Sequence, residues 1–275
     1  MTDIREISEP EDMKKIFPVA SSAWGMEKPE SFISDVLNAI RFHGGLVLGA
    51  YDGERLIGFQ FGLIGRKNDT FYLYSHMTGV IEEKKYSGTG FMLKAAQREW
   101  AIQKGYRLVA WTFDPLMSLN GNFNIRKLGA ISRTYLVNFY GTMTDRLNAG
   151  VETDRFIAEW WIHRDRVPAV FEPEQCAAAN MTKQGPSGLR CIASVSLPQE
   201  NRMTVEIPAD FIAVKKHSLE LAAEWREKTR HIFRTAFTKG YAVTSFANVG
   251  GRSYYLLERS ASTAGYCGER VFDQE

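Results

Sequence analysis

The change in hydrophobic period after residue 80 limits most strongly what this chain can fold into. Residues 71–80, FYLYSHMTGV, have the composition of a strand, whereas residues 89–104 place Leu93 and Trp100 on one side of a helix. The next run, LVAWTF at 108–113, is apolar at nearly every position, which indicates a strand buried on both faces. Strand, helix and buried strand in this order predict a right-handed parallel crossover and therefore an α/β (α+β) fold.

The segments before this crossover predict two helices and a hairpin. Apolar residues recur at helical spacing in 10–24 and again in 29–42, where two glycines end the pattern. Two strand patterns follow at 46–51 and 56–64, and the Asp-Gly dipeptide between them favours a tight hairpin turn. Because a hairpin precedes the parallel crossover, we expect a mixed sheet.

The segments after the crossover predict one more part of the same domain and then a second unit. A short helix at 116–127 and strands at 130–140 and 155–163 complete the first domain, which we place at residues 1–166. Residues 167–190 are rich in proline and glycine and are predicted to be a linker or an irregular segment.

Residues 191–275 predict a C-terminal α+β extension. It contains a strand at 203–207, a helix at 218–238 and a hairpin at 241–258. The helix carries a stripe of large apolar residues that includes Trp225. A unit of this size with so little sheet buries too little surface alone, so we expect it to pack on the first domain.

Composition excludes several classes of protein. The net charge of +2 over 275 residues is too small to indicate binding to nucleic acid or to an anionic membrane. The sequence lacks a run of about 18 apolar residues that could span a bilayer, and it begins without the apolar segment of a signal peptide. Its three cysteines have no metal-site spacing, so we expect no metal, reduced thiols and a cytoplasmic location.

The segment 79–91, GVIEEKKYSGTGF, carries the most specific signal. Lys85-x-x-Gly88-x-Gly90 places two glycines where the backbone turns into a helix and where a ligand can approach closely. A helix start offers unpaired N–H groups and the positive end of the helix dipole, which together bind phosphate groups. The third glycine of a dinucleotide-binding fingerprint and the Gly-Lys-Ser/Thr of a P-loop are both missing. A plain glycine turn before a helix is the remaining alternative.

This segment resembles the acetyl-CoA signature of the GNAT superfamily, Arg/Gln-x-x-Gly-x-Gly/Ala, with Lys85 in the place of Arg/Gln. The phrases SHMTGV (75–80), WTFDP (111–115), FNIRKLGA (123–130) and NFYG (138–141) look like a subgroup of longer predicted GNAT acyltransferases with a C-terminal extension. The resemblance implies a GNAT fold with a splayed central sheet. It also implies a cofactor, acetyl-CoA or another acyl-CoA such as succinyl-CoA.

The resemblance further assigns residues to coenzyme A. Those expected to contact it are Val80, Ile81, Lys85, Tyr86, Ser87, Gly88, Thr89, Gly90, Phe91, Asn120, Asn124 and Lys127. Backbone N–H groups near the end of strand 71–80 are expected to hold the pantetheine arm or to polarise the thioester. For Lys127, a solvated surface position is the alternative.

Four residues are candidates for the chemistry. His76, Glu82 and Asp114 are candidate general bases, and Tyr140 is a candidate acid. Each has a structural alternative. His76 would be a hydrogen-bonded histidine of the sheet, and Glu82 a solvated side chain. Asp114 would form an Asx turn before a proline, and Tyr140 would be a core aromatic residue. The tyrosine that many GNAT enzymes use as an acid is replaced here by Ile125, which leaves the general acid open.

Together these observations predict an N-acyltransferase that moves an acetyl or succinyl group from coenzyme A to the amine of a small molecule, such as an amino acid. A protein or peptide N-acetyltransferase and a catalytically silent acyl-CoA sensor remain alternatives. An edge strand near 155–163 would allow a homodimer.

Overall fold

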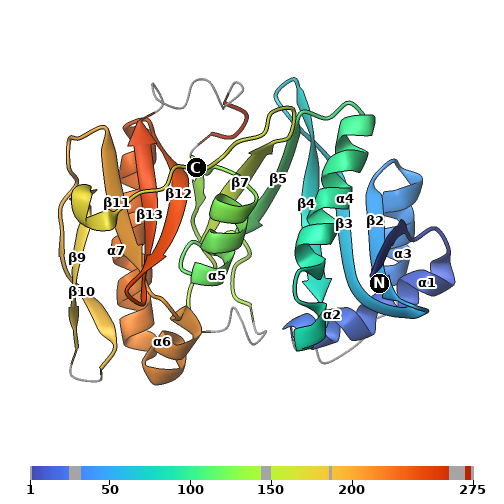
Figure 1. Ribbon diagram of the computed structural model, residues 1–275, viewed down its shortest axis with the longest axis horizontal. Coiled ribbons are helices and arrows are strands. Elements are labelled where there is room, and N and C mark those ends of the chain that lie inside the picture. Colours follow the sequence, from blue (N-terminus) through green and yellow to red (C-terminus); the bar gives the residue numbers. More distant parts are fainter. Residues whose placement is uncertain (1, 25–31, 144–149, 186–187, 260–269, 274–275) are drawn as a thin grey trace. The chain divides into compact units, whose positions relative to one another are not determined.

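The computed structural model describes residues 2–24, 32–143, 150–185, 188–259 and 270–273 (Figure 1). The chain divides into two compact units, and the division falls within strand β5, between Trp111 and Thr112. The predicted domain of residues 1–166 therefore spans the first unit and part of the second, and its boundary stays a prediction.

The first unit is a mixed sheet with helices. The strands β1 (Asp3–Glu6), β2 (Leu46–Asp52), β3 (Arg55–Lys67), β4 (Thr70–Val80) and β5 (Leu108–Phe113) follow one another in that order. Their pairing is antiparallel except between β4 and β5, which are parallel. The predicted mixed α/β class and parallel crossover are thus confirmed.

The helices of the first unit agree with the sequence pattern. The predicted helix 10–24 is split into α1 (Pro10–Lys14) and α2 (Ile16–Trp24), and α3 covers Phe32–Phe42. The first residues of the predicted helix 29–42 lie outside the described part of the chain. The crossover helix α4 (Thr89–Gln103) buries one side, including Leu93, and contacts β2, β3 and β4.

The second unit begins at the end of β5. It continues with α5 (Ser118–Gly121), a π-helical segment at Asn122–Lys127, β6 (Tyr135–Leu136) and β7 (Arg155–Trp161). The predicted strand 130–140 is reduced to β6, with isolated bridges at Ile131 and Ser132 before it and a left-handed residue, Asn138 with φ +45°, just after it. The strand order ends at β6 rather than β7, so β7 does not provide the free edge expected for a dimer.

The rest of the second unit is a small sheet with a long helix. β8 (Ala177–Ala178), β11 (Arg202–Ile207), β12 (Tyr241–Val249) and β13 (Arg252–Arg259) form a sheet in the order β12-β13-β11-β8. β9 (Asn180–Gln184) pairs with β10 (Arg190–Val195). A 3-10 turn (Pro173–Gln175), α6 (Phe211–His217) and α7 (Leu219–Thr238) complete the unit. Segment 167–190 therefore contains short strands as well as irregular backbone.

The apolar stripe of α7 is covered by strands β6 and β7. The Phe156 ring of β7 lies 4.7 Å from that of Phe233 and 5.5 Å from that of Phe237, measured between centroids. The Tyr135 ring of β6 stacks on Phe233 at 6.2 Å. Aromatic side chains bury large areas, so this cluster fixes the C-terminal helix to the strands that precede residue 166.

Candidate functional site

The start of α4 has unpaired backbone donors. Gly88 occupies the cap position with φ +96°, and no side chain caps the helix. The N–H groups of Phe91 and Met92 donate to the Gly88 carbonyl at 3.0 and 3.1 Å. Within the described part of the chain, no acceptor is recorded for the N–H groups of Gly88, Thr89 and Gly90. Free donors and the positive end of a helix dipole are the features by which helix starts bind anions.

The space in front of both glycines is open. A Cβ atom added at Gly88 would meet no atom within 4 Å, and one at Gly90 would meet only Val80 Cγ2, at 4.0 Å. The two glycines are therefore not required by close packing against other parts of the protein. An extended phosphate-containing ligand has room to contact the backbone there, so the residues present fit the pyrophosphate of coenzyme A.

The side chains of the loop have other partners. The Lys85 ammonium is exposed and lies 3.8 Å from carboxylate oxygens of both Asp52 and Glu83. Tyr86 is buried, and its hydroxyl donates to Asp52 Oδ2 at 2.7 Å. The Tyr86 hydrogen bond thus stabilises the loop conformation. Exposed ion pairs at this distance are weak, so the Lys85 side chain can reorient toward a phosphate. Of the remaining predicted contacts, Ser87 and Phe91 are exposed.

The end of β4 corrects one predicted contact. The Ile81 N–H donates to the Ile57 carbonyl at 2.9 Å and is therefore not a donor for coenzyme A. Hydrogen-bonded and non-hydrogen-bonded pairs alternate in antiparallel strands, and Gly58 pairs with Val80 in the next position. The Val80 N–H consequently points away from β3, and it remains a candidate donor to the pantetheine arm or the thioester.

His76 lies at an irregularity in β4. Gly62 of β3 pairs with Ser75 and Phe61 pairs with Met77, so His76 is one extra residue on its strand, a β-bulge. Its imidazole is exposed between the rings of Phe61 and Tyr74, at 5.3 and 5.9 Å. Partial burial lowers the His76 pKa below its ordinary value of 6.5, so the ring is neutral at pH 7 and able to accept a proton.

A pocket of about 430 Å³ adjoins the end of β4. Glu82, the third predicted base, lines it beside Ile81 and Glu83. The remaining lining residues come from α2 and the residue before it, from the β2–β3 turn and from the start of β3: Lys15, Pro18, Val19, Ser22, Glu54, Arg55 and Leu56. The Ser22 hydroxyl accepts a hydrogen bond from the Glu82 N–H at 3.4 Å. The wall is charged and of both signs, which suits a small polar ligand.

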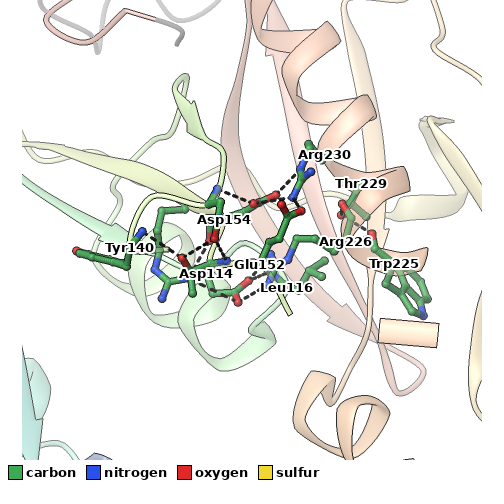
Figure 2. A network of polar contacts seen from close by, with 12 residues as sticks. Asp114, Leu116, Tyr140, Glu152, Asp154, Trp225, Arg226, Thr229 and Arg230 are labelled. Carbon is green, nitrogen blue, oxygen red and sulfur yellow. Dashed lines mark hydrogen bonds and ion pairs between the residues drawn. The ribbon is translucent and has the colours of Figure 1, made fainter. Parts of the chain in front are cut away.

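Asp114 belongs to a buried ionic network in the second unit (Figure 2). Its carboxylate accepts two hydrogen bonds from Arg226, at 2.8 and 2.5 Å, and Arg155 lies at 3.9 Å. The Leu116 N–H also donates to it at 2.8 Å, which is the Asx turn that sequence analysis left open. Burial by itself would raise the Asp114 pKa, but the two arginines and the Leu116 N–H together hold it below 3.8. These contacts favour a structural role over that of a base.

The same network fixes α7 at a second point. Arg230 donates to both oxygens of the buried Asp154, at 2.7 and 2.8 Å, and pairs with Glu152 at 2.5 Å. The Tyr135 hydroxyl donates to Asp154 at 2.6 Å. Sequence analysis missed the ion pairs of Arg226 and Arg230 because their partners are 76 to 112 residues away in the sequence, beyond any local pattern.

The other predicted residues of the second unit are more accessible. Tyr140 lies outside any strand, is 38% exposed, and shares a hydrogen bond with Thr112 at 2.8 Å, so it is not a core aromatic residue. Asn124 is buried, and no partner of its side-chain amide is recorded among the described residues. Asn120 is half-buried and Lys127 is exposed. The buried Ile125 occupies the position of the missing tyrosine.

Several solved structures are similar to this chain. The chain is 13% identical to the ribosomal-protein-S18-alanine N-acetyltransferase from Escherichia coli over 62% of this chain and 100% of that one, with a TM-score of 0.47. It is 13% identical to an acetyltransferase of the GNAT family from Streptococcus pneumoniae over 58% and 98%, with a TM-score of 0.45. The chain is similar to GNAT acetyltransferases. A GNAT family acetyltransferase from Brucella melitensis, solved in complex with acetyl-CoA, is 17% identical over 42% of this chain and 77% of that one, with a TM-score of 0.35.

Comparison of the sequence with models of protein families gave no match, and comparison with curated proteins gave none. In the described residues no group of three or more metal-ligating side chains comes together. No helix there is long and apolar enough to cross a membrane. Cys176 and Cys191 are free thiols, and Cys267 lies outside the described residues.

The Asp114 contacts predict a loss of stability rather than of chemistry. Asp114→Ala leaves Arg226 buried without its main partner, so we expect the free energy of unfolding in urea to fall by roughly 3–5 kcal/mol at pH 7. Since the pKa of Asp114 is lowered by folding, its contribution is complete above pH 3.8 and is lost as the pH falls below that value. The difference from wild type should therefore shrink in acid.

The control is Asp69→Ala, which removes a carboxylate from an exposed ion pair and should change stability by less than about 1 kcal/mol. An Asp114→Ala protein of wild-type stability that has lost turnover would instead support the role of Asp114 as a base or acceptor-binding group.

Proposed function

We propose that this protein is an acyl-CoA-dependent N-acyltransferase that transfers an acetyl or other acyl group to the amine of a small molecule. The observation that carries the proposal is the uncapped start of α4, where two glycines border open space and three N–H groups have no acceptor among the described residues. It follows directly on a strand whose last N–H, that of Val80, is directed away from β3. A ligand with a pyrophosphate and an amide-containing arm matches both features.

The pocket beside Glu82 supports a small acceptor. Its volume of about 430 Å³ lies within the range of small-molecule sites. Glu54, Glu82 and Glu83 on its wall favour a cationic amine, while Lys15 and Arg55 would accept a carboxylate on the same molecule. An amino acid carries both groups. The size and charge of the pocket therefore favour a small molecule over a protein N-terminus.

The reaction would be a direct aminolysis of the thioester. The amine nitrogen forms a bond to the thioester carbonyl carbon, the C–S bond breaks, and the amine proton leaves with a base. His76 and Glu82 are the two candidate bases: His76 has a neutral imidazole at the bulge of β4, and Glu82 lines the pocket proposed for the acceptor. The Val80 N–H is placed to stabilise the oxyanion. A thiolate is a good leaving group near neutral pH, so the missing tyrosine at Ile125 does not prevent the reaction.

Release of free coenzyme A thiol tests the function. Acetyl-CoA and succinyl-CoA are each incubated with the full chain and a panel of amino acids, amines and peptides. We expect thiol release that depends on a small amine, with the N-acylated product seen by mass spectrometry. Binding of coenzyme A without turnover on any amine would support the sensor instead, and turnover only on peptides would support the protein acetyltransferase.

Gly90 gives a sharp test of the binding site. Its φ is not in the left-handed region and a Cβ there meets only Val80 at 4.0 Å, so Gly90→Val folds without a clash but places methyl groups where the ligand approaches. We expect the Kd for coenzyme A, measured by calorimetry, to rise at least about tenfold. Gln103→Val, at the exposed far end of α4, is the matched control. Equal affinity in a folded Gly90→Val protein would contradict the site.

His76 predicts a defined pH dependence. Since its pKa is lowered from 6.5, kcat/KM should fall only as the pH drops below that value. In His76→Asn we expect kcat to fall by about 10²-fold and the acid limb to disappear. His43→Asn, at another exposed histidine of the first unit, should keep the wild-type profile. An unchanged acid limb in His76→Asn would assign the base to another group, such as Glu82.

A further inference from the structure

The buried face of α4 contains an amine that the proposed reaction does not use. Lys94 is only 3% exposed, and its Nζ donates to Ser75 Oγ at 2.8 Å and to Gln97 Oε1 at 3.2 Å. The same atom lies 3.8 Å from the centre of the Trp111 ring of β5. Lys94 therefore connects α4 with β4 and β5 in the interior of the first unit.

No opposite charge compensates this amine. The groups that face it are Ser75 from β4, Gln97 from α4 and Trp111 from β5, with Gln60 of β3 behind Ser75, and all are uncharged. In the described residues Lys94 forms no ion pair. Burial alone lowers its pKa from 10.5 to about 7. An unpaired cation in a low-dielectric interior is energetically costly, so proteins usually avoid it.

The buried charges of the second unit show the usual arrangement. Arg226 is paired with Asp114, Glu159 accepts two hydrogen bonds from Arg133 Nε and one from Nη2, and Glu206 pairs with Arg190 and Arg252. Each of these ions is paired with an opposite charge within the chain, as expected for charges in a low-dielectric interior. Lys94 differs because its neighbours supply hydrogen bonds and no charge.

The cluster around Lys94 also has spare hydrogen-bonding capacity. Gln97 Nε2 and Gln60 Oε1 are buried and have no partner in the described chain. The Ser75 hydroxyl accepts from Lys94 and from Gln60 Nε2, at 2.8 and 3.4 Å, so its own proton remains available. Three donors, namely Nζ, Nε2 of Gln97 and the Ser75 hydroxyl, thus lie together. A carboxylate, which only accepts, fits such a set.

The position of the cluster indicates which ligand brings the carboxylate. β4 and β5 pair in parallel at Leu73–Val109 and at Tyr74–Ala110. The next residue on each strand, Ser75 and Trp111, is the one that contacts Lys94, and the bulge at His76 follows. The cluster therefore lies one residue beyond the last paired residues of the two parallel strands, beside the bulge at His76, which is a candidate base of the proposed reaction.

We propose that Lys94, with Gln97 and Ser75, binds the charged end of the acyl group, so that the donor is an acyl-CoA whose chain ends in a carboxylate. This inference rests on the proposed acyl-CoA function. The carboxylate would complete the ion pair that Lys94 lacks, and an acetyl group would leave it incomplete. Lys94 is in this account a residue that selects the donor and takes no part in breaking the thioester.

Two stable thioethers of coenzyme A test the inference by calorimetry. S-butyl-CoA and S-(3-carboxypropyl)-CoA have four-carbon chains that end in a methyl and in a carboxylate. We expect the carboxylate to bind at least about tenfold more tightly to the full-length protein. At pH 8.5 Lys94 is mostly neutral in the free protein, so pairing with a carboxylate should take up close to one proton per site. Titrations in buffers of different ionisation enthalpy measure that uptake.

Lys94→Met removes the amine and nearly keeps its volume. It should bind S-butyl-CoA at least as tightly as wild type does and lose both the preference and the proton uptake for S-(3-carboxypropyl)-CoA. Equal affinities of wild type for the two thioethers, without proton uptake, would overturn the inference while leaving the acyl-CoA function in place. If neither thioether nor coenzyme A itself binds, the proposed function fails and this inference fails with it.

Discussion

The unpaired N–H groups at the start of α4 are the constraint on which the functional account depends. A helix normally satisfies such groups with a capping side chain, and here Gly88 offers none. Its left-handed backbone turns the chain from the 3-10 turn at Lys84–Tyr86 into the helix, while Gly90 keeps the approach open. The buried Tyr86 donates a hydrogen bond to Asp52 and so stabilises the loop. Within the described residues the protein thus leaves a set of donors without an acceptor, which an anionic ligand could supply.

The two units treat buried charge differently, and this difference separates structure from function. In the second unit, Asp114 and Asp154 each receive an arginine from α7, and these pairs fix the helix to the strands before residue 166. In the first unit, Lys94 has neutral neighbours only. Paired ions hold elements together because removing one partner is costly, whereas an unpaired ion is a cost that a ligand can relieve.

The parts of the fold that follow from local periodicity were predictable. The hairpin β2–β3, the crossover β4–α4–β5 and the helix α7 lie close to the predicted residue ranges, because spacing of apolar residues and turn dipeptides specify them. The glycine loop was likewise found from its spacing. β8 was missed because it has two residues and its partner β11 lies about 25 residues later. β9 and α6 were also missed, although β9 pairs with the neighbouring β10 and α6 has a local cap at Asp210.

The candidate site was less predictable, because roles depend on contacts across the sequence. Asp114 reads as a strand-end carboxylate, yet Arg226, 112 residues later, pairs with it. Ile81 lies in the segment that resembles the signature, but its N–H donates to the Ile57 carbonyl of β3 and is not available to a ligand. Lys94 and Gln97 sit in a helix of ordinary composition, and only their burial beside Leu93 distinguishes them from solvated residues.

Hydrogen–deuterium exchange of the full chain, with and without coenzyme A, tests the central claim most directly. The N–H groups of Gly88, Thr89 and Gly90 have no recorded protein acceptor, so they should exchange quickly in the free protein. Saturating coenzyme A should slow exchange in the peptide that spans residues 86–92. Unchanged exchange in this peptide, with slower exchange elsewhere in the chain, would show that the ligand binds at another site and would contradict the account.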